Sequence, residues 1–224
     1  MEKNIKAVIF DMFETLVTLN EGPVYFGTQI ASDLNINRDK FRSIWDKSDE
    51  DRTNGKRTLE DVIAAIMRAN DVYSPELLDM VIKKRTDTKR ACFQRIPDEI
   101  FVMLNSLKEK GIRIGLISNC FSEEVTVIKE SRLYDLFDAP CLSFELGIKK
   151  PDPRIFEECM RRLDVTPGEC LYIGDGGSRE LEAARQIGMK AYQAAWFIVK
   201  DPEQFPVNDS FEQLYKPSDV IGLI

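Results

Sequence analysis

Two acids in this chain close short apolar runs, and together they could do chemistry. Asp11 follows the run Ala7-Val8-Ile9-Phe10, and Asp175 follows the run that ends at Gly174. Desolvating a carboxylate is costly, so an acid at the end of a buried strand needs a compensating role. The carboxyl ends of parallel strands meet at one edge of an open sheet, where ligands bind. Two carboxylates directed at one crevice indicate a divalent cation, an oxygen nucleophile, or both.

The residue types available restrict the remaining chemistry. None of the 224 residues is histidine, which excludes a Ser-His-Asp or Cys-His apparatus and His-based zinc catalysis. Acid–base work must therefore fall to carboxylates or lysine. The cysteines are dispersed, odd in number and without a CxxC pair, a pattern typical of buried free thiols in a reducing compartment. They are Cys92, Cys120, Cys141, Cys159 and Cys170.

The overall composition excludes several partner classes. Hydrophobic residues make up 43% of the chain and charged residues 31%, as in globular proteins. The net charge of -7 disfavours non-specific binding to nucleic acid or anionic membranes. No apolar run reaches the roughly 18 residues of a membrane span, and no signal-peptide segment follows Met1-Glu2-Lys3. We expect a cytoplasmic protein with no nucleic-acid or membrane partner, and the oligomeric state stays open.

Short β-branched runs alternate with amphipathic helical patterns. This predicts an α/β fold with a doubly wound parallel sheet and helices on both faces. The predicted strands are Ile5–Phe10, Ile112–Ile117, Ala139–Ser143, Cys170–Gly174 and Lys190–Gln193. Asp152 and Pro153 predict the cap and first turn of one helix, and another is expected from Pro97 to Gly111. The tail after Asp201 is expected to be loop-like.

The segment 19–91 breaks this alternation, since it contains no convincing strand. Three apolar stripes at helical spacing predict helices, and the stripes begin at Phe41, Leu59 and Leu77. Asn54-Gly55 and Ser74-Pro75 mark the breaks between them. An insert directly after the first strand and its loop would lie over the crevice, as a lid does. We expect residues 1–18 and 92–224 to form the α/β core and residues 19–91 to form an inserted all-α cap domain.

Four motifs follow one another in a fixed order at the ends of predicted strands. They are Phe10-Asp11-Met12-Phe13-Glu14-Thr15-Leu16, Leu116-Ile117-Ser118-Asn119, Gly147-Ile148-Lys149-Lys150-Pro151-Asp152-Pro153 and Tyr172-Ile173-Gly174-Asp175-Gly176-Gly177-Ser178-Arg179-Glu180. In this order and spacing the chain resembles the haloacid dehalogenase (HAD) superfamily of hydrolases. More narrowly, it resembles the branch with a helical cap between the first and second motifs. The resemblance covers the core from Ala7 to about Gln193 and implies a Rossmann-like core.

The resemblance assigns roles to the first and last motifs. It implies that Asp11 attacks an electrophilic centre, phosphorus in most such families, and forms a covalent aspartyl intermediate. Thr15 is expected to hydrogen-bond near this nucleophile. The implied cofactor is Mg²⁺, which prefers oxygen ligands. Its implied protein ligands are a carboxylate oxygen of Asp11, the backbone carbonyl of Phe13, and Asp175.

The same resemblance assigns the groups around the substrate. Ser118 is expected to hydrogen-bond a phosphoryl oxygen, with Asn119 beside it. Lys150 is expected to neutralise charge on the transferred group and to hold Asp11 in place. Glu180 stands where the family usually has a second acid of the fourth motif. It is expected to orient Lys150 or a metal-bound water.

The first motif departs from the phosphatase pattern at two positions. Phosphatases of this superfamily usually carry a second Asp two residues after the nucleophile, as general acid and base, and here that residue is Phe13. An aromatic ring cannot donate a proton, and losing a positioned general acid costs about 10²–10⁴ in rate. The usual Gly after it is Glu14, a position where positive φ would disfavour a side chain. Glu14 could also reach in as a substitute acid.

Three functions remain open. The sequence favours Mg²⁺-dependent hydrolysis of a small phosphorylated metabolite through an aspartyl-phosphate intermediate. An aromatic residue at Phe13 also resembles the 2-haloacid dehalogenases, which work without metal, but those enzymes lack the Gly-Asp pair that this chain keeps at Asp175. The third alternative is a HAD-like protein of low activity that binds a phosphorylated metabolite or a protein partner. Fold alone does not name the substrate. Candidates in the insert for setting specificity are Tyr25, Phe26, Trp45 and Arg52.

Overall fold

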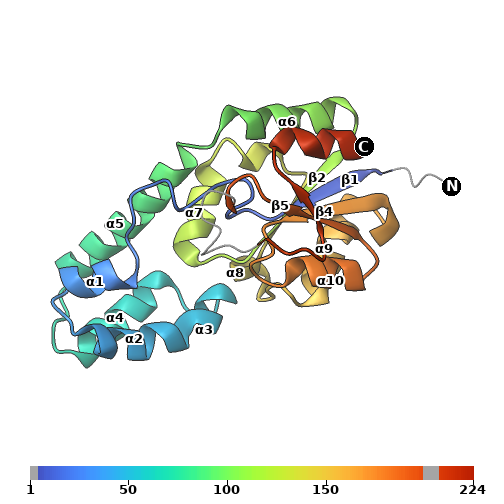
Figure 1. The fold of residues 1–224 in the computed structure, drawn as a ribbon. Coiled ribbons are helices and arrows are strands. Elements are labelled where there is room, and N and C mark those ends of the chain that lie inside the picture. Colours follow the sequence, from blue (N-terminus) through green and yellow to red (C-terminus); the bar gives the residue numbers. More distant parts are fainter. Residues whose placement is uncertain (1–4, 199–206) are drawn as a thin grey trace.

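The computed structural model describes residues 5–198 and 207–224, drawn in colour in Figure 1. The charged start Met1-Glu2-Lys3 and residues 201–206 of the tail lie outside the described residues. Six strands form one parallel sheet in the order β3-β2-β1-β4-β5-β6. Their bounds are β1 Ala7–Phe10, β2 Arg113–Ser118, β3 Ala139–Leu142, β4 Cys170–Gly174, β5 Lys190–Ala194 and β6 Glu212–Leu214. The predicted α/β fold with a parallel sheet is confirmed.

The five predicted strands are present with small shifts at their ends. The largest shift is at β1, which begins at Ala7 and not at Ile5. The prediction of a loop-like tail was wrong, because β6 pairs with β5 and a 3₁₀ helix follows at Pro217–Leu223. A three-residue edge strand is too short to show an alternating pattern, so its apolar periodicity carries no signal.

Alternate residues of the central strands supply two apolar layers. In β1, Val8 and Phe10 belong to one layer, and Ala7 and Ile9 to the other. A strand buried on both faces reads as a continuous apolar run, which is what made β1 visible in the sequence. Two main helices pack into each layer, and Figure 1 shows them on opposite sides of the sheet. They are α6 (Asp98–Glu109) and α7 (Ser122–Glu130), then α9 (Pro153–Leu163) and α10 (Glu180–Gln186).

Local signals set the ends of two of these helices. The side chain of Asp152 accepts a hydrogen bond from the backbone N–H of Arg154 at 3.0 Å, and Pro153 begins α9. Pro97 precedes α6, and Gly111 follows it with a left-handed φ of 75°. Both helix predictions are confirmed, because cap residues and left-handed glycines act locally. A short helix, α8 (Ser143–Leu146), comes directly after β3.

The segment between β1 and α6 is helical and lies to one side of the sheet (Figure 1). Its helices are α1 Gly27–Asp33, α2 Arg38–Trp45, α3 Asp49–Thr53, α4 Leu59–Ala69 and α5 Pro75–Phe93. We call α1 to α4 and the loops joining them the cap. The cap has its own apolar cluster, to which Phe41 and Ile63 belong. The domain bounds at residues 18 and 92 stay a prediction, because α5 runs on from this cluster and packs against α7. No described helix has the length and apolarity needed to cross a membrane.

Candidate active site

The centre of the sheet contains the point where the strand order reverses. β1 and β4 are neighbours there, although β2 and β3 lie between them in the chain. Ligands of open α/β sheets bind outside the carboxyl ends of the strands at such a point. Asp11 and Asp175 directly follow these two strands. The backbone N–H of Asp11 donates to the carbonyl of Ile173 at 2.9 Å, which fixes the two strand ends against each other.

A buried lysine joins the first and fourth motifs. The ammonium of Lys150 forms ion pairs with Oδ1 of Asp11 and Oε2 of Glu180. The hydroxyl of Tyr172 lies 3.3 Å from the same Nζ and donates to Oε2 of Glu180 at 3.0 Å. Glu180 packs so closely against β4 that a Cβ on Gly174 would lie 2.0 Å from its Oε1, so a side chain at residue 174 would displace the carboxylate that Lys150 binds. The structure therefore brings Asp11, Lys150 and Glu180 together.

The acids outnumber the cation at this site. Asp11, Asp175 and Glu180 each offer an oxygen, and these oxygens lie within 4.8 Å of one another. Burial raises the pKa of Asp11 well above its usual value, with a further rise from Glu180 that Lys150 opposes. Burial and the charge of Glu180 raise the pKa of Asp175 to about 7. Burial lowers the pKa of Lys150, but Asp11 and Glu180 raise it more, so the lysine stays charged.

This donor set fits a hard divalent cation. Mg²⁺ takes oxygen ligands and commonly binds one or two carboxylates, and three ionised acids beside one ammonium lack two positive charges, which one divalent cation supplies. Asp11 and Asp175 both end strands at the same edge, so the coarser prediction of a buried acidic cluster that could hold a metal is confirmed. Glu180 already bonds Lys150 and Tyr172, which leaves the two aspartates as the better ligands.

Two buried hydroxyls at the same edge have no partner. Oγ1 of Thr15 and Oγ of Ser118 make no hydrogen bond to any described residue, and both side chains are fully buried. A buried polar group left unpaired costs about 1–3 kcal/mol, so each is expected to meet a ligand. Thr15 lies on the loop after β1, and Ser118 ends the neighbouring strand β2. Hydroxyl donors in these places suit an anion held next to Asp11.

Asn119 lines a cavity at this edge, and its side-chain amide is hydrogen-bonded to the backbone of Lys150. Its amide accepts from the N–H of Lys150 at 2.8 Å and donates to the carbonyl of Lys150 at 3.0 Å. It also lies 3.3 Å from Oγ of Ser178. The second motif thus holds the third and fourth motifs in place, which makes Asn119 a positioning residue for Lys150.

The contacts of Phe13 and Glu14, the two unusual residues of the first motif, do not support proton transfer by either side chain. Glu14 has a left-handed φ of 56°, the conformation that explains why glycine is usual there. Its carboxylate accepts from Oγ1 of Thr18 at 2.7 Å and from the N–H of Leu19 at 2.8 Å. The ring of Phe13 packs edge-on against Phe93, with 6.3 Å between centroids. The geometry therefore gives no support to Glu14 as a substitute acid.

The cap covers the motif residues. A cavity of about 420 Å³ lies between α3 and the loops after the strands. Its walls include Lys150, Phe121 and Ser178 from the core, with Asp49 and Thr53 from the cap. The carbonyl of Thr53 accepts from Oγ of Ser143 at 2.9 Å, so the cap rests directly on the core. Sequence reasoning missed Asp49, Thr53 and Tyr172, since α3 has no apolar stripe and Tyr172 reads as an ordinary strand residue.

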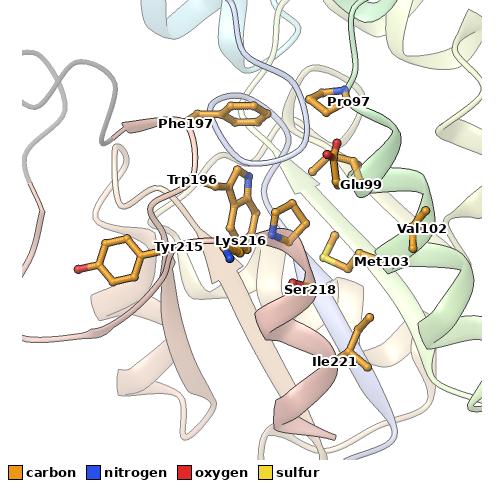
Figure 2. A pocket seen from close by; sticks show the side chains of 12 residues that line it. Pro97, Glu99, Val102, Met103, Trp196, Phe197, Tyr215, Lys216, Ser218 and Ile221 are labelled. Atoms are coloured by element: carbon orange, nitrogen blue, oxygen red, sulfur yellow. The ribbon is translucent and has the colours of Figure 1, made fainter.

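A second hollow lies away from the motifs. It has a volume of about 530 Å³ between α6 and the C-terminal segment, and Figure 2 shows Val102, Trp196 and Tyr215 around it. None of its described lining residues belongs to the four motifs. It connects with the site through one bond, since the indole N–H of Trp196 donates to the carbonyl of Thr15 at 2.8 Å. Trp196 thereby supports the loop after β1.

Known proteins share this architecture. A 2-haloacid dehalogenase from Pseudomonas syringae pv. Tomato DC3000 superposes with a TM-score of 0.66 at 22% identity, covering 98% of this chain and 97% of its own. A HAD family enzyme from Bacteroides thetaiotaomicron, in complex with magnesium and inorganic phosphate, gives 0.63 at 19% identity over 85% and 94%. Similarity at this level of identity shows the fold.

The sequence comparisons identify the family. A glyceraldehyde 3-phosphate phosphatase from Methanopyrus kandleri is 26% identical over 195 residues, which are 83% of this chain and 82% of that protein. The predicted enzyme class, a hydrolase, is confirmed, and this relative favours phosphatase over dehalogenase chemistry. A family model for haloacid dehalogenase-like hydrolases matches residues 5–188. The chain belongs to the haloacid dehalogenase-like hydrolase family.

Proposed function

We propose that the protein is a Mg²⁺-dependent phosphatase that acts on a small phosphorylated metabolite through an aspartyl-phosphate intermediate. The observation that carries this proposal is the buried group of Asp11, Lys150 and Asp175 at the point where the strand order reverses. The proposal places the protein in the cytoplasm. The five cysteines support this location, because all are free and buried, as expected in a reducing compartment.

Each motif residue has a task in this mechanism. Asp11 attacks the phosphorus and takes the phosphoryl group, and water later cleaves the acyl phosphate. Lys150 balances the negative charge on the transferred group. The unpaired hydroxyls of Thr15 and Ser118 donate to its oxygens, which satisfies both buried donors. Glu180 fixes the Lys150 ammonium through the ion pair between them.

The metal would be held by residues of the same group. Asp11, Asp175 and the backbone carbonyl of Phe13 would hold Mg²⁺, which when bound supplies positive charge that draws the phosphate to the nucleophile. The excess of acids over cations among these buried side chains supports its presence. The magnesium complex of the Bacteroides thetaiotaomicron relative supports the choice of ion.

The leaving group decides the rate in this proposal. Phe13 cannot protonate a departing alkoxide, and the carboxylate of Glu14 is bonded to its own loop. Substrates whose leaving groups are acidic need no such proton. We therefore expect aryl and acyl phosphates to react much faster than alkyl phosphates.

Phosphate release tests the proposal. The panel contains an aryl phosphate, acetyl phosphate and glyceraldehyde 3-phosphate, each assayed with Mg²⁺ and with a chelator, for the wild type and for Asp11→Asn. The proposal predicts Mg²⁺-dependent release that the Asp11→Asn variant lacks. Equal release by the variant, or equal rates for leaving groups of very different basicity, would contradict it.

Dehalogenation is the second candidate, favoured by Phe13 alone. Halide leaves without a proton, so an enzyme of this kind has no use for an acid at that position. The half-buried acid Asp175, with its raised pKa, has no role in the displacement of halide from a haloacid. Chloride release from 2-chloropropionate in the presence of a chelator would establish this alternative. The third reading, a protein that binds a phosphorylated metabolite or a protein partner with little turnover, predicts binding of the panel without release.

A further inference from the structure

The cap holds a buried arginine with an unused donor. Arg52 on α3 is 2% exposed, and its guanidinium carbon lies 3.9 Å from the ring centroid of Trp45 and 4.2 Å from that of Phe121. Nε donates to Oγ of Ser48 at 3.0 Å, and Nη2 lies 3.5 Å from Asp49. Nη1 makes no hydrogen bond within residues 5–198 and 207–224. A guanidinium fixed by two rings with one nitrogen unused is prepared for an anion.

The charge of Arg52 is poorly balanced in comparison with its neighbours. Two other buried cations near the cap, both on α5, have buried acid partners. These ion pairs are Arg85–Glu123 at 3.2 Å and Lys89–Glu124 at 2.7 Å. The only ion-pair partner of Arg52 among the described residues is Asp49, whose side chain is 58% exposed. Burial lowers the pKa of Arg52, and the opposing effects of Asp49, Glu123 and Glu124 do not offset it, as expected for an under-compensated buried cation.

Arg52 lies next to residues that line the cavity beside Lys150. Asp49 and Thr53 lie on either side of it along α3 and line that cavity, as does Phe121, on whose ring it stacks. The cavity is also lined by two further cations, Lys149 and Arg179. Neither forms an ion pair within the part of the chain that the structure describes. Arg179 has a left-handed φ of 51°, a strained backbone conformation of the kind found at binding sites.

We propose that the substrate carries a carboxylate on the part that leaves, and that Arg52 binds this carboxylate. The proposal rests on the proposed function, since it takes the phosphoryl group to lie at Asp11. A monoanion fits better than a second phosphate, because Asp49 already occupies one side of the guanidinium and only one nitrogen is unused. Lys149 and Arg179 add a positive field at the cavity. The substrate class is therefore a small phosphorylated carboxylic acid.

Three C3 phosphates that differ only at the far carbon test this assignment. They are 3-phosphoglycerate, glyceraldehyde 3-phosphate and glycerol 3-phosphate. Their affinities are measured by calorimetry with Mg²⁺ in the Asp11→Asn protein, which cannot consume them. A charge-assisted hydrogen bond is expected to make 3-phosphoglycerate bind about 10- to 100-fold more tightly than glycerol 3-phosphate. Adding Arg52→Gln should remove this preference and leave the affinity for glycerol 3-phosphate nearly unchanged.

Two further variants serve as controls. Arg42→Gln removes an exposed cap arginine whose partner is Asp46, and it should leave the preference intact. Arg52→Lys keeps the charge and should keep part of the preference, which covers the case in which Arg52→Gln fails to fold. Circular dichroism shows which variants are folded.

The outcomes separate the two proposals. Equal affinities for the three ligands in the parent protein overturn the carboxylate assignment, as does an equal loss for all three in Arg52→Gln. If the wild type releases phosphate from these esters without preferring 3-phosphoglycerate, the phosphatase proposal stands and the Arg52 assignment fails. If it binds none of them and releases phosphate from no member of the panel, both fail.

Discussion

Two buried groups of charges in this molecule differ in their balance. At the sheet edge, Asp11, Asp175 and Glu180 face the single cation Lys150, and the pKa values of both aspartates are raised. Between α5 and α7, two cations face two acids, Arg85 with Glu123 and Lys89 with Glu124. The pKa of Glu124 is lowered by Lys89 and Arg85 even though its burial acts to raise it.

The difference distinguishes a ligand-binding site from a structural contact. In the balanced group every charge has a partner within the chain, and the ion pairs stabilise the packing of α5 against α7. An unbalanced group gains from an ion that the chain does not provide, which is the condition for binding a ligand. By the same reasoning, the acidic edge suits a cation and the under-compensated Arg52 suits an anion.

The largest effect is expected from removing the nucleophile. Asp11→Asn should lower phosphate release by a factor on the order of 10⁴ or more. The free energy of unfolding should stay level or rise, because the variant removes a carboxylate that burial and Glu180 disfavour. Phosphate assays and chemical denaturation measure the two quantities. If Asp11→Asn unfolds more easily but its folded fraction still releases phosphate, Asp11 has no part in the mechanism.

The opposite result is expected at the balanced group. Glu123→Gln leaves the buried guanidinium of Arg85 without its partner and should cost about 3–5 kcal/mol of unfolding free energy. The folded fraction should keep its phosphate release. Glu130→Gln is the matched control, because its pair with Arg90 is exposed and worth about 1 kcal/mol or less. If Glu123→Gln lowers the free energy of unfolding no more than this control does, the Arg85–Glu123 pair does not stabilise the contact between α5 and α7.

The acidic edge should bind Mg²⁺ in a pH-dependent way. The pKa of Asp175 is about 7 in the folded chain, against 3.8 ordinarily, so the folded state holds this proton longer than the unfolded state. Without metal, the contribution of this group to stability therefore falls as pH rises from about 4 to about 7. Mg²⁺ needs the ionised carboxylate, so its affinity should rise about tenfold per pH unit below 7 and then level off.

Thermal denaturation with and without Mg²⁺ at several pH values measures this linkage. Asp175→Asn should abolish most of the stabilisation by Mg²⁺, whereas exposed Asp135→Asn should leave it intact. A stabilisation that does not change between pH 5 and pH 8 would show that the ion binds elsewhere.

The smallest effect concerns Phe13. Phe13→Asp restores a proton donor and should raise turnover of alkyl phosphates by about tenfold or more, short of the full value of a general acid because the loop carries Glu14. Phe13→Asn is the control, because asparagine has the size of aspartate but lacks its carboxyl group. Equal rates for the two variants would mean that the loop or the cap limits the reaction.

The sequence predicted the sheet edge and the main cap helices well, and the contacts between cap and core poorly, for physical reasons. Asp11, Ser118 and Asp175 end apolar strands or follow them directly, and a parallel sheet brings such positions together whatever the helices do. The left-handed backbone at Glu14, a conformation that favours glycine, was also predictable, because it depends only on the local backbone.

The missed residues depend on tertiary packing. Tyr172 alternates as any strand residue does, and its bond to Glu180 appears only when α10 lies under β4. Asp49 and Thr53 come from a short polar helix, α3, whose position against the core is set by contacts distant in sequence, such as the one from Ser143 to Thr53. No local pattern encodes such contacts.

The central claim is that Asp11 receives the phosphoryl group. The direct measurement is rapid acid quenching during turnover of acetyl phosphate with Mg²⁺, followed by mass spectrometry of the peptides. We predict one phosphoryl group on the peptide that contains Asp11, lost on adding a chelator and absent in Asp11→Asn. Steady phosphate release with an unmodified Asp11, or with the label on another residue, would contradict the account.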